Sequence, residues 1–333
     1  MKNYVSAGLL ILLTALATLA QFPPVPPPKG RAVDLAWAFP VPDKVQPPAE
    51  DLTVPKKVPD SDKSYTQKQI DDGFNPPDWF PTDHSAMPQV VAHGSMPIVR
   101  ACALCHLASG QGHPESANLA GLNAAYMERQ FAAFKSQERI NGGAMVAIAQ
   151  NISDDDLHQA LSWFSALNRI GLVKVKETTT VPKTRVNGGR MRLPVAGGAT
   201  EPLGKRIIEL PQNMELSLSR DPHSGTIAYV PVGSLAKGKA LVTTGGVGKT
   251  TKCMTCHGPG LTGLAEVPRI AGDSPLYIAR QLFDFQNGVT PGTWPELMKG
   301  VVAKLNDDDI IAIAAYVASL PPAAVATSSA AAK

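Results

Sequence analysis

The chain carries one five-residue pattern twice: residues 102–106 read Cys-Ala-Leu-Cys-His and residues 253–257 read Cys-Met-Thr-Cys-His. The two pairs hold the only 4 cysteines among 333 residues, which is too few for a disulfide-stapled scaffold of this length. With 44% hydrophobic and 18% charged residues, the composition is that of a globular protein. The length leaves room for about two ordinary domains.

Two thiols at this spacing can add across the two vinyl groups of haem, and the histidine that follows can then bind the iron. The pattern predicts two covalent haem c groups, attached through Cys102, Cys105, Cys253 and Cys256. His106 and His257 are the predicted proximal iron ligands. A redox dithiol and a four-thiolate zinc site are the competing interpretations. Both leave unexplained why each pair is followed by histidine inside a repeated segment.

The repeat extends well beyond the two motifs. An offset of 151 carries residues 119–121 (Leu-Ala-Gly) onto 270–272 (Ile-Ala-Gly) and Tyr126 onto Tyr277. The offset then becomes 153, which carries residues 154–156 (three aspartates) onto 307–309. We therefore expect two copies of one domain, at residues 84–170 and 234–322.

Each copy is predicted to be helical. Apolar residues recur at helical spacing after Tyr126 and after Tyr277. Ser153 and Asn306 each stand three residues before an aspartate, a pattern typical of a helix start. The prolines at 321–322 end the last helix. The expected fold class is all-α, with an extended N-terminal segment and a long irregular connection between the domains.

The second axial ligand of each iron is predicted from the repeat. Met145 and Met298 occupy equivalent positions, nine residues before the first aspartate of each triplet. A thioether opposite an imidazole stabilises ferrous iron and raises its potential. Methionines that merely fill the core are the alternative. Ligation of the first haem by His93 or His113 is a second alternative, because both histidines flank the first motif.

The N-terminal part reads as an export signal followed by a proline-rich segment. An apolar run at residues 5–20 follows Lys2, so residues 1–20 are predicted to be a signal peptide or a membrane anchor. Of the 30 prolines, 16 lie in the first 100 residues, which favours extended chain over residues 21–83. This segment is either a surface strap or a flexible tether. The aromatic residues that would anchor a strap are Trp37, Phe39, Trp79 and Phe80.

Residues 171–233 are predicted to be an extended connection in which a hairpin could form. Short β-prone runs stand at residues 172–175 and 226–230. A segment of this length without elements of its own is usually functional or disordered. Residues 323–333 are expected to be a disordered tail.

These residues resemble the class I cytochrome c domains, and their pairing is similar to the dihaem cytochrome c4 family. The resemblance covers residues 84–170 and 234–322, about half of the chain. It rests on the haem motif, the Ala-Gly turn, the Tyr…Arg-Gln…Phe helix, the methionine and the last helix. It implies that a carbonyl before the turn accepts a hydrogen bond from the proximal histidine. Pro268 matches the family's proline there, and Ala117 stands at that place in the first copy.

The expected function is electron transfer in the periplasm, between a dehydrogenase or quinol-oxidising donor and an oxidase or cytochrome acceptor. A dihaem peroxidase is the enzymatic alternative, and a haem-bearing docking subunit of a dehydrogenase complex is another. A net charge of +3 is too small to favour nucleic acid as a partner. A basic rim for a redox partner is predicted near the second motif, formed by Lys249, Lys252, Lys299 and Lys304. Membrane association is expected only through the N-terminus.

Overall fold

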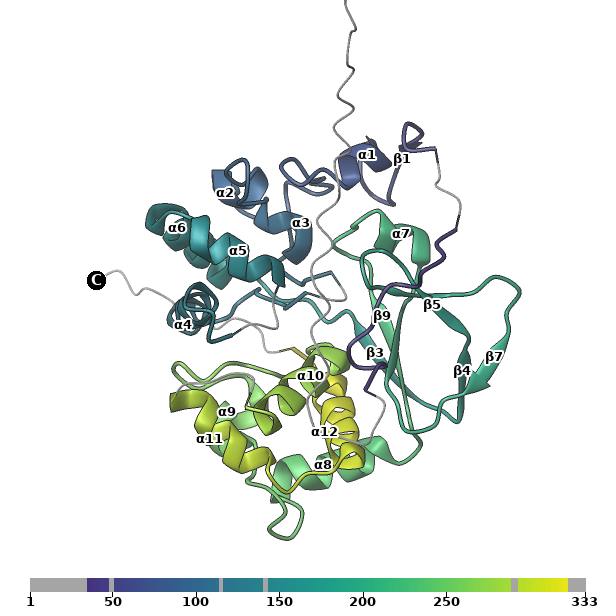
Figure 1. The fold of residues 1–333 in the computed structure, drawn as a ribbon, viewed down its shortest axis with the longest axis vertical. Coiled ribbons are helices and arrows are strands. Elements are labelled where there is room, and N and C mark those ends of the chain that lie inside the picture. The colour runs from purple at the N-terminus through teal and green to yellow at the C-terminus, as the bar shows by residue number, and fades with distance from the viewer. Residues whose placement is uncertain (1–34, 48–50, 114–115, 140–142, 289–292, 323–333) are drawn as a thin grey trace, which may run out of the picture.

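The computed structural model describes residues 35–47, 51–113, 116–139, 143–288 and 293–322. Two helical units lie one above the other, with a region of strands beside them (Figure 1). The predictions for residues 1–20 and 323–333 lie outside the described residues. Within the part that is described, no helix is long and apolar enough to cross a membrane.

The first helical unit follows the strap and carries the first cysteine motif. Its helices are α2 (Gln89–Ala92), α3 (Cys102–His106), α4 (Ala124–Lys135), α5 (Gly143–Asn151) and α6 (Asp154–Ala166). The Ser153 side chain caps α6 by accepting from the backbone N–H of Asp156, as predicted. Trp163 and Phe164 of α6 are buried in the core of this unit.

The second helical unit repeats this order. Its helices are α8 (Ser234–Thr244), α9 (Met254–His257), α10 (Pro275–Gln286), α11 (Thr293–Val302) and α12 (Asp307–Ser319), with a 3-10 turn at Pro259–Leu261. Asn306 and Asp309 form the predicted capping box at the start of α12. Helices α8 and α12 cross closely at Gly238, where an added Cβ would lie 1.9 Å from the Ala312 carbonyl oxygen. Only glycine fits this crossing.

The prediction of an all-α protein is wrong for residues 171–233, which are not an irregular connection. Their elements are β3 (Val173–Glu177), β4 (Thr180–Pro182), β5 (Thr184–Val186), β6 (Arg192–Pro194), β7 (Thr200–Pro202), β8 (Ile208–Pro211), α7 (Met214–Leu218) and β9 (Thr226–Val230). The two runs noted in the sequence become β3 and β9, which pair in parallel, with β8 antiparallel to β9. Strands β4 and β7 pair separately, as do β5 and β6. We call residues 171–233 the sheet segment.

Residues 35–83 form a strap along the molecule and are not a tether over the part described. Trp37 is 5% exposed and meets Phe283 of the second unit edge to face, with ring centroids 6.1 Å apart. Farther along, the short strands β1 (Pro55–Lys56) and β2 (Tyr65–Thr66) and helix α1 (Gln67–Ile70) lie beside α7 (Figure 1). Trp79 is 1% exposed and its indole N–H donates to the Ser219 carbonyl at 2.8 Å. The other two predicted anchors, Phe39 and Phe80, pack against the same buried clusters.

Candidate haem sites

The first cysteine motif forms helix α3, which places Cys102 and Cys105 on one helical turn. Both thiols are free, with no disulfide between them. His106 ends the helix and is 8% exposed. Its Nδ1–H donates to the Ala117 carbonyl at 2.8 Å. A carbonyl only accepts, so the proton is on Nδ1, and Nε2 keeps its lone pair for a metal.

The second motif repeats this geometry. Cys253 is the N-cap of α9 and His257 is its last residue. His257 is also 8% exposed, and its Nδ1–H donates to the Pro268 carbonyl at 2.7 Å. The two carbonyls that the family resemblance implied are therefore confirmed as the acceptors. Such a bond fixes the ring orientation and raises the basicity of the nitrogen that would bind iron.

The Ala-Gly turn that follows each motif is held in the same way in both units. The Gly121 N–H donates to the Phe164 carbonyl at 2.9 Å, and the Gly272 N–H donates to the Val317 carbonyl at 2.8 Å. Each bond ties the loop that carries the acceptor carbonyl to the last helix of its unit. The position of the histidine ring is thus set by the same contacts twice.

Burial favours the protonation states from which haem attachment begins. It lowers the pKa of both His106 and His257, which keeps the imidazoles neutral and able to bind a metal. Burial also raises the pKa of Cys102 to about 12 and that of Cys253 to about 11, so both remain thiols at neutral pH. These residues fit a covalently attached haem.

The two predicted methionine ligands lie on matching helices. Met145 is on α5 and Met298 is on α11, and both side chains are half-buried. Met298 packs against the core of the second unit. Of the alternative ligands, His93 is exposed, and His113 directs its Nε2–H to the Ser217 carbonyl at 3.2 Å. Ligation by the methionines stays a prediction.

A zinc site made from all four cysteines would need the two pairs to converge. Among the described residues, which include all four cysteines, no group of three or more His, Cys, Asp and Glu side chains lies close enough to hold a metal ion. The two pairs lie on α3 and α9 of different units (Figure 1). This arrangement counts against shared zinc and agrees with one cofactor for each pair.

Two of the four lysines in the predicted basic rim are paired with carboxylates. Lys249 pairs with the buried Asp309, and Lys299 lies 3.5 Å from Glu296. Lys252 and Lys304 are exposed. The second motif therefore has an exposed positive charge at Lys252, directly before Cys253.

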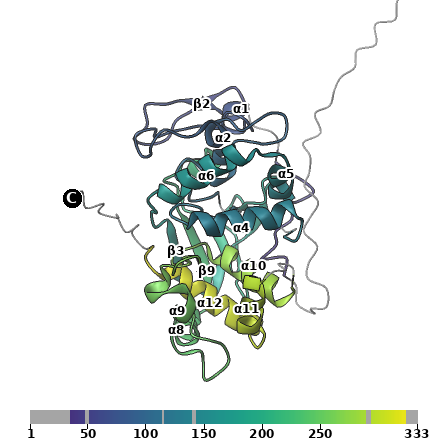
Figure 2. The ribbon, with the colours of Figure 1, turned by 90° about the vertical axis from the view of Figure 1, so that its left-hand side faces the viewer.

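Sequence reasoning did not predict the polar junction between the two helical units, which lie one above the other in Figure 2. The Arg169 Nη2 donates to Asp273 Oδ1 at 2.5 Å, and the Arg269 Nη1 donates to the same oxygen at 3.2 Å. The Arg269 Nε also reaches the Ala120 carbonyl at 3.0 Å in the other unit. Each unit thus contributes an arginine to one buried carboxylate.

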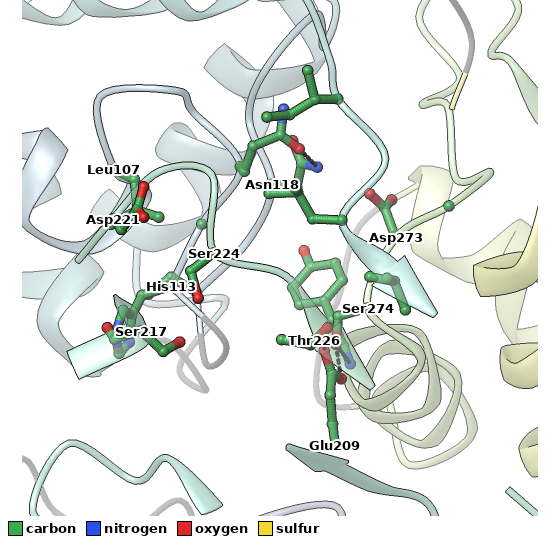
Figure 3. A pocket seen from close by; sticks show the side chains of 18 residues that line it. Leu107, His113, Asn118, Glu209, Ser217, Asp221, Ser224, Thr226, Asp273 and Ser274 are labelled. Carbon is green, nitrogen blue, oxygen red and sulfur yellow. Dashed lines mark hydrogen bonds between the residues drawn. The ribbon is translucent and has the colours of Figure 1, made fainter. Parts of the chain in front are cut away.

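A cavity of about 60 Å³ lies where the two units meet the sheet segment (Figure 3). His113 and Asn118 reach it from the first unit, Glu209 and Asp221 from the sheet segment, and Asp273 from the second unit. It has space for a few water molecules and is far too small for haem. Neither cysteine pair is among its lining residues.

The sequence comparisons agree with this geometry. The family model "Cytochrome c" matches residues 235–321. Cytochrome c-554(548) of Halomonas halodenitrificans is 35% identical over 75 residues, 22% of this chain and 90% of that protein. Cytochrome c4 of Stutzerimonas stutzeri is 28% identical over 136 residues, 37% of this chain and 65% of that protein.

A thiosulfate dehydrogenase electron acceptor of Stutzerimonas stutzeri is 24% identical over 230 residues, 68% of this chain and 82% of that protein. The chain spans about half to two thirds of the length of the cytochrome c4 relatives. It belongs to the cytochrome c family, with a doubled motif like that of the dihaem cytochromes c4. The cofactor is covalently bound haem c.

Proposed function

We propose that this chain is a periplasmic electron-transfer protein with two haem c groups. Cys102 and Cys105 attach the first haem, and Cys253 and Cys256 attach the second. The observation that carries the proposal is the matched pair of histidines, each with its Nδ1–H donated to a backbone carbonyl, at 2.8 Å for His106 and 2.7 Å for His257. This leaves Nε2 of each ring available to iron in both units.

His106 and Met145 would bind the iron of the first haem, and His257 and Met298 would bind the iron of the second. Bound haem iron would supply one-electron redox chemistry, and two strong protein ligands leave it no open position for substrate. The chain would hold the iron ligands in place and bury the two haem groups. On this proposal the protein has no peroxidase turnover, because such an enzyme needs an accessible coordination position. The proposed haem domains span residues 84–170 and 234–322.

A pyridine haemochrome assay on the purified holoprotein tests the central claim. Two c-type haems per chain are expected. The double variant Cys102→Ser/Cys105→Ser should keep one haem, and Cys253→Ser/Cys256→Ser should keep the other. One haem or none in the unaltered protein would contradict the proposal.

The proposed electron donor is a dehydrogenase. The support is the relative described as a thiosulfate dehydrogenase electron acceptor, which aligns with 68% of this chain. Stopped-flow mixing of the oxidised protein with thiosulfate dehydrogenase and thiosulfate tests this. We expect haem reduction only when both enzyme and substrate are present. No reduction with a catalytically competent enzyme would exclude this donor and leave the haem assignment intact.

A further inference from the structure

The two cysteine motifs have the same local fold but very different exposure. After each motif the same backbone hydrogen bond closes the loop. The Gly112 N–H donates to the His106 carbonyl at 3.0 Å, and the Gly263 N–H donates to the His257 carbonyl at 2.8 Å. Yet positions related by the offset of 151 differ in burial. Leu104 is 5% exposed and Ala108 is 6% exposed, whereas the equivalent Thr255 and Pro259 are exposed. The second motif therefore serves as a reference for how exposed the same local fold is without further cover.

The same contrast holds at the cysteines and just before them. Cys105 is half-buried and its equivalent, Cys256, is exposed. Ala101, which precedes the first motif, is 2% exposed, and the equivalent Lys252 is exposed. Since the local folds match, the difference comes from what lies over the first motif.

Two segments cover the first motif and, among the residues that the structure describes, have no counterpart over the second: residues 67–79 of the strap and residues 217–221 of the sheet segment. We call them together the cap. The Ala101 N–H donates to the Gly73 carbonyl in the strap at 3.0 Å. From the other side, Arg220 Nη1 donates to the Leu104 carbonyl inside the motif at 2.7 Å. His113 extends the contact by its bond to the Ser217 carbonyl.

Arg220 joins the two halves of the cap to each other as well as to the motif. Its Nε donates to the Ile70 carbonyl at 3.1 Å, and its Nη2 lies 3.4 Å from Asp71 Oδ1. Its backbone has a φ of 56°, a left-handed conformation that is uncommon for a residue other than glycine. The surrounding contacts therefore hold Arg220 in an unfavourable conformation, which directs its guanidinium at the motif.

The cap has a core of its own. Ile70 and Trp79 are 0% and 1% exposed, and the Tyr65 ring meets Trp79 edge to face at 4.7 Å. The Trp79 indole N–H binds the Ser219 carbonyl at 2.8 Å, which fastens the strap to the sheet segment. Edge-to-face aromatic pairs and satisfied buried donors are features of a stable contact.

The second motif presents an open face. Thr255, Cys256 and Pro259 are exposed along it, with Lys252 at one end. Leu264, 55% exposed, belongs to the same surface, because a Cβ added to Gly258 would lie 3.7 Å from the Leu264 Cβ. Of the residues named on this face only Lys252 is charged, and it lies exposed at the edge of the face. Its complement is a surface with an apolar centre and carboxylates at the rim.

We propose that the cap closes the motif edge of the first haem, so that protein partners exchange electrons at the open face of the second motif. The partner is a one-electron redox protein with an apolar, acid-rimmed docking surface. One electron leaves the reduced partner and converts ferric to ferrous iron in the second haem, with no bond made or broken. This inference rests on the proposed haem assignment.

Paramagnetic broadening in NMR spectra of the holoprotein tests the asymmetry. Hexacyanochromate(III) is a redox-inert trianion that broadens resonances near the surfaces it binds. The haem methyl signals are first assigned to each haem by nuclear Overhauser contacts. We expect the methyl signals of the second haem to broaden and those of the first to stay sharp. Equal broadening of both sets, stronger broadening of the first, or broadening of neither would overturn the proposal.

Two matched charge-reversal variants test whether the probe binds at the open face or responds only to the net charge of the protein. Lys252→Glu should abolish the broadening of the second haem's signals. Lys68→Glu makes the same change in net charge on the exposed surface of α1 in the cap and should leave the broadening unchanged. Equal effects of the two variants would show that the probe senses net charge alone and would overturn the assignment of the face.

Opening the cap should expose the first haem. Arg220→Gln removes the bonds to Leu104 and Ile70, and Trp79→Phe removes only the indole bond to Ser219. We expect the first haem's methyl signals to broaden in at least one of them. Signals that stay sharp in both folded variants would contradict the role of the cap. Because haem content is measured beforehand, a chain with fewer than two haems would instead contradict the proposed function.

Discussion

Arg169 and Asp273 form a buried ion pair across the junction of the two helical units, with the Arg169 Nη2 2.5 Å from Asp273 Oδ1. Their side chains are 1% and 8% exposed. Arg269 shares the same carboxylate oxygen at 3.2 Å. Removing one partner from a buried pair leaves uncompensated charge in a poorly solvated place. The junction therefore depends on this carboxylate more than on any exposed ion pair.

Asp273→Asn should lower the free energy of unfolding by about 3–5 kcal/mol, because two guanidiniums lose their shared counter-charge. Asp308→Asn is the matched control, since Asp308 pairs with Lys205 at 2.9 Å with side chains 43% and 78% exposed. An exposed pair contributes about 0–1 kcal/mol. Urea unfolding of the holoprotein measures both changes. Similar losses in the two variants would contradict the role given to the buried pair.

Gly238→Ala should destabilise the second unit by about 1–3 kcal/mol, the usual cost of overpacking. The new methyl group would meet the Ala312 carbonyl, and α8 and α12 would have to move apart. Gly300→Ala on α11 is the control, because an added Cβ there meets nothing within 4 Å. That change should be neutral or stabilise the helix by about 0.5–1 kcal/mol. Thermal unfolding monitored by circular dichroism distinguishes a loss of stability from a gain. A Gly238→Ala variant as stable as the unaltered protein would disprove the close crossing of α8 and α12.

Local signals were enough to predict most of the two helical units. Ser153 and Asn306 cap the helices that the sequence placed after them, because N-capping depends on residues only three apart. The burial of Trp37 and Trp79 also agrees with the strap interpretation. In each case a short stretch of sequence contained the physical reason for the structure.

The sheet segment and the cap could not be predicted in this way. Strand β3 pairs with β9, about fifty residues further along the chain, and the other strands of this segment are only three or four residues long. Such strands carry little periodicity of their own. Arg220 binds Ile70 across 150 residues of sequence, and no local pattern marks that approach. The role of Arg220 can be seen only in the folded structure, where the strap and the sheet segment both contact the first motif.

Acid should weaken the contact between His113 and the sheet segment. Burial and the charge of Arg220 lower the pKa of His113 to about 3, against an ordinary value of 6.5. Between these values the unfolded chain binds a proton that the folded chain does not, so stability falls as the pH falls below 6.5. The contribution is at most about 1.4 kcal/mol per pH unit.

Urea unfolding of the holoprotein at several pH values between 4 and 8 measures this slope. His113→Gln should flatten it over the acid part of the range. His158→Gln, at an exposed position on α6, should leave the slope as in the unaltered protein. If His113→Gln and the unaltered protein lose stability equally with acid, the pH dependence arises elsewhere in the chain.

Met298→Ala should lower the reduction potential of one haem and leave the other unchanged, because loss of a thioether removes a ligand that favours ferrous iron. The emptied coordination position should then bind carbon monoxide, with one equivalent per chain in the reduced protein. Met145→Ala should do the same at the other haem, and both changes together should give two equivalents. Met191→Ala is the control, since that buried methionine lies in the sheet segment. Spectroelectrochemical titration and carbon monoxide difference spectra measure the outcomes. Unchanged spectra and potentials in Met298→Ala would remove Met298 from the second haem site.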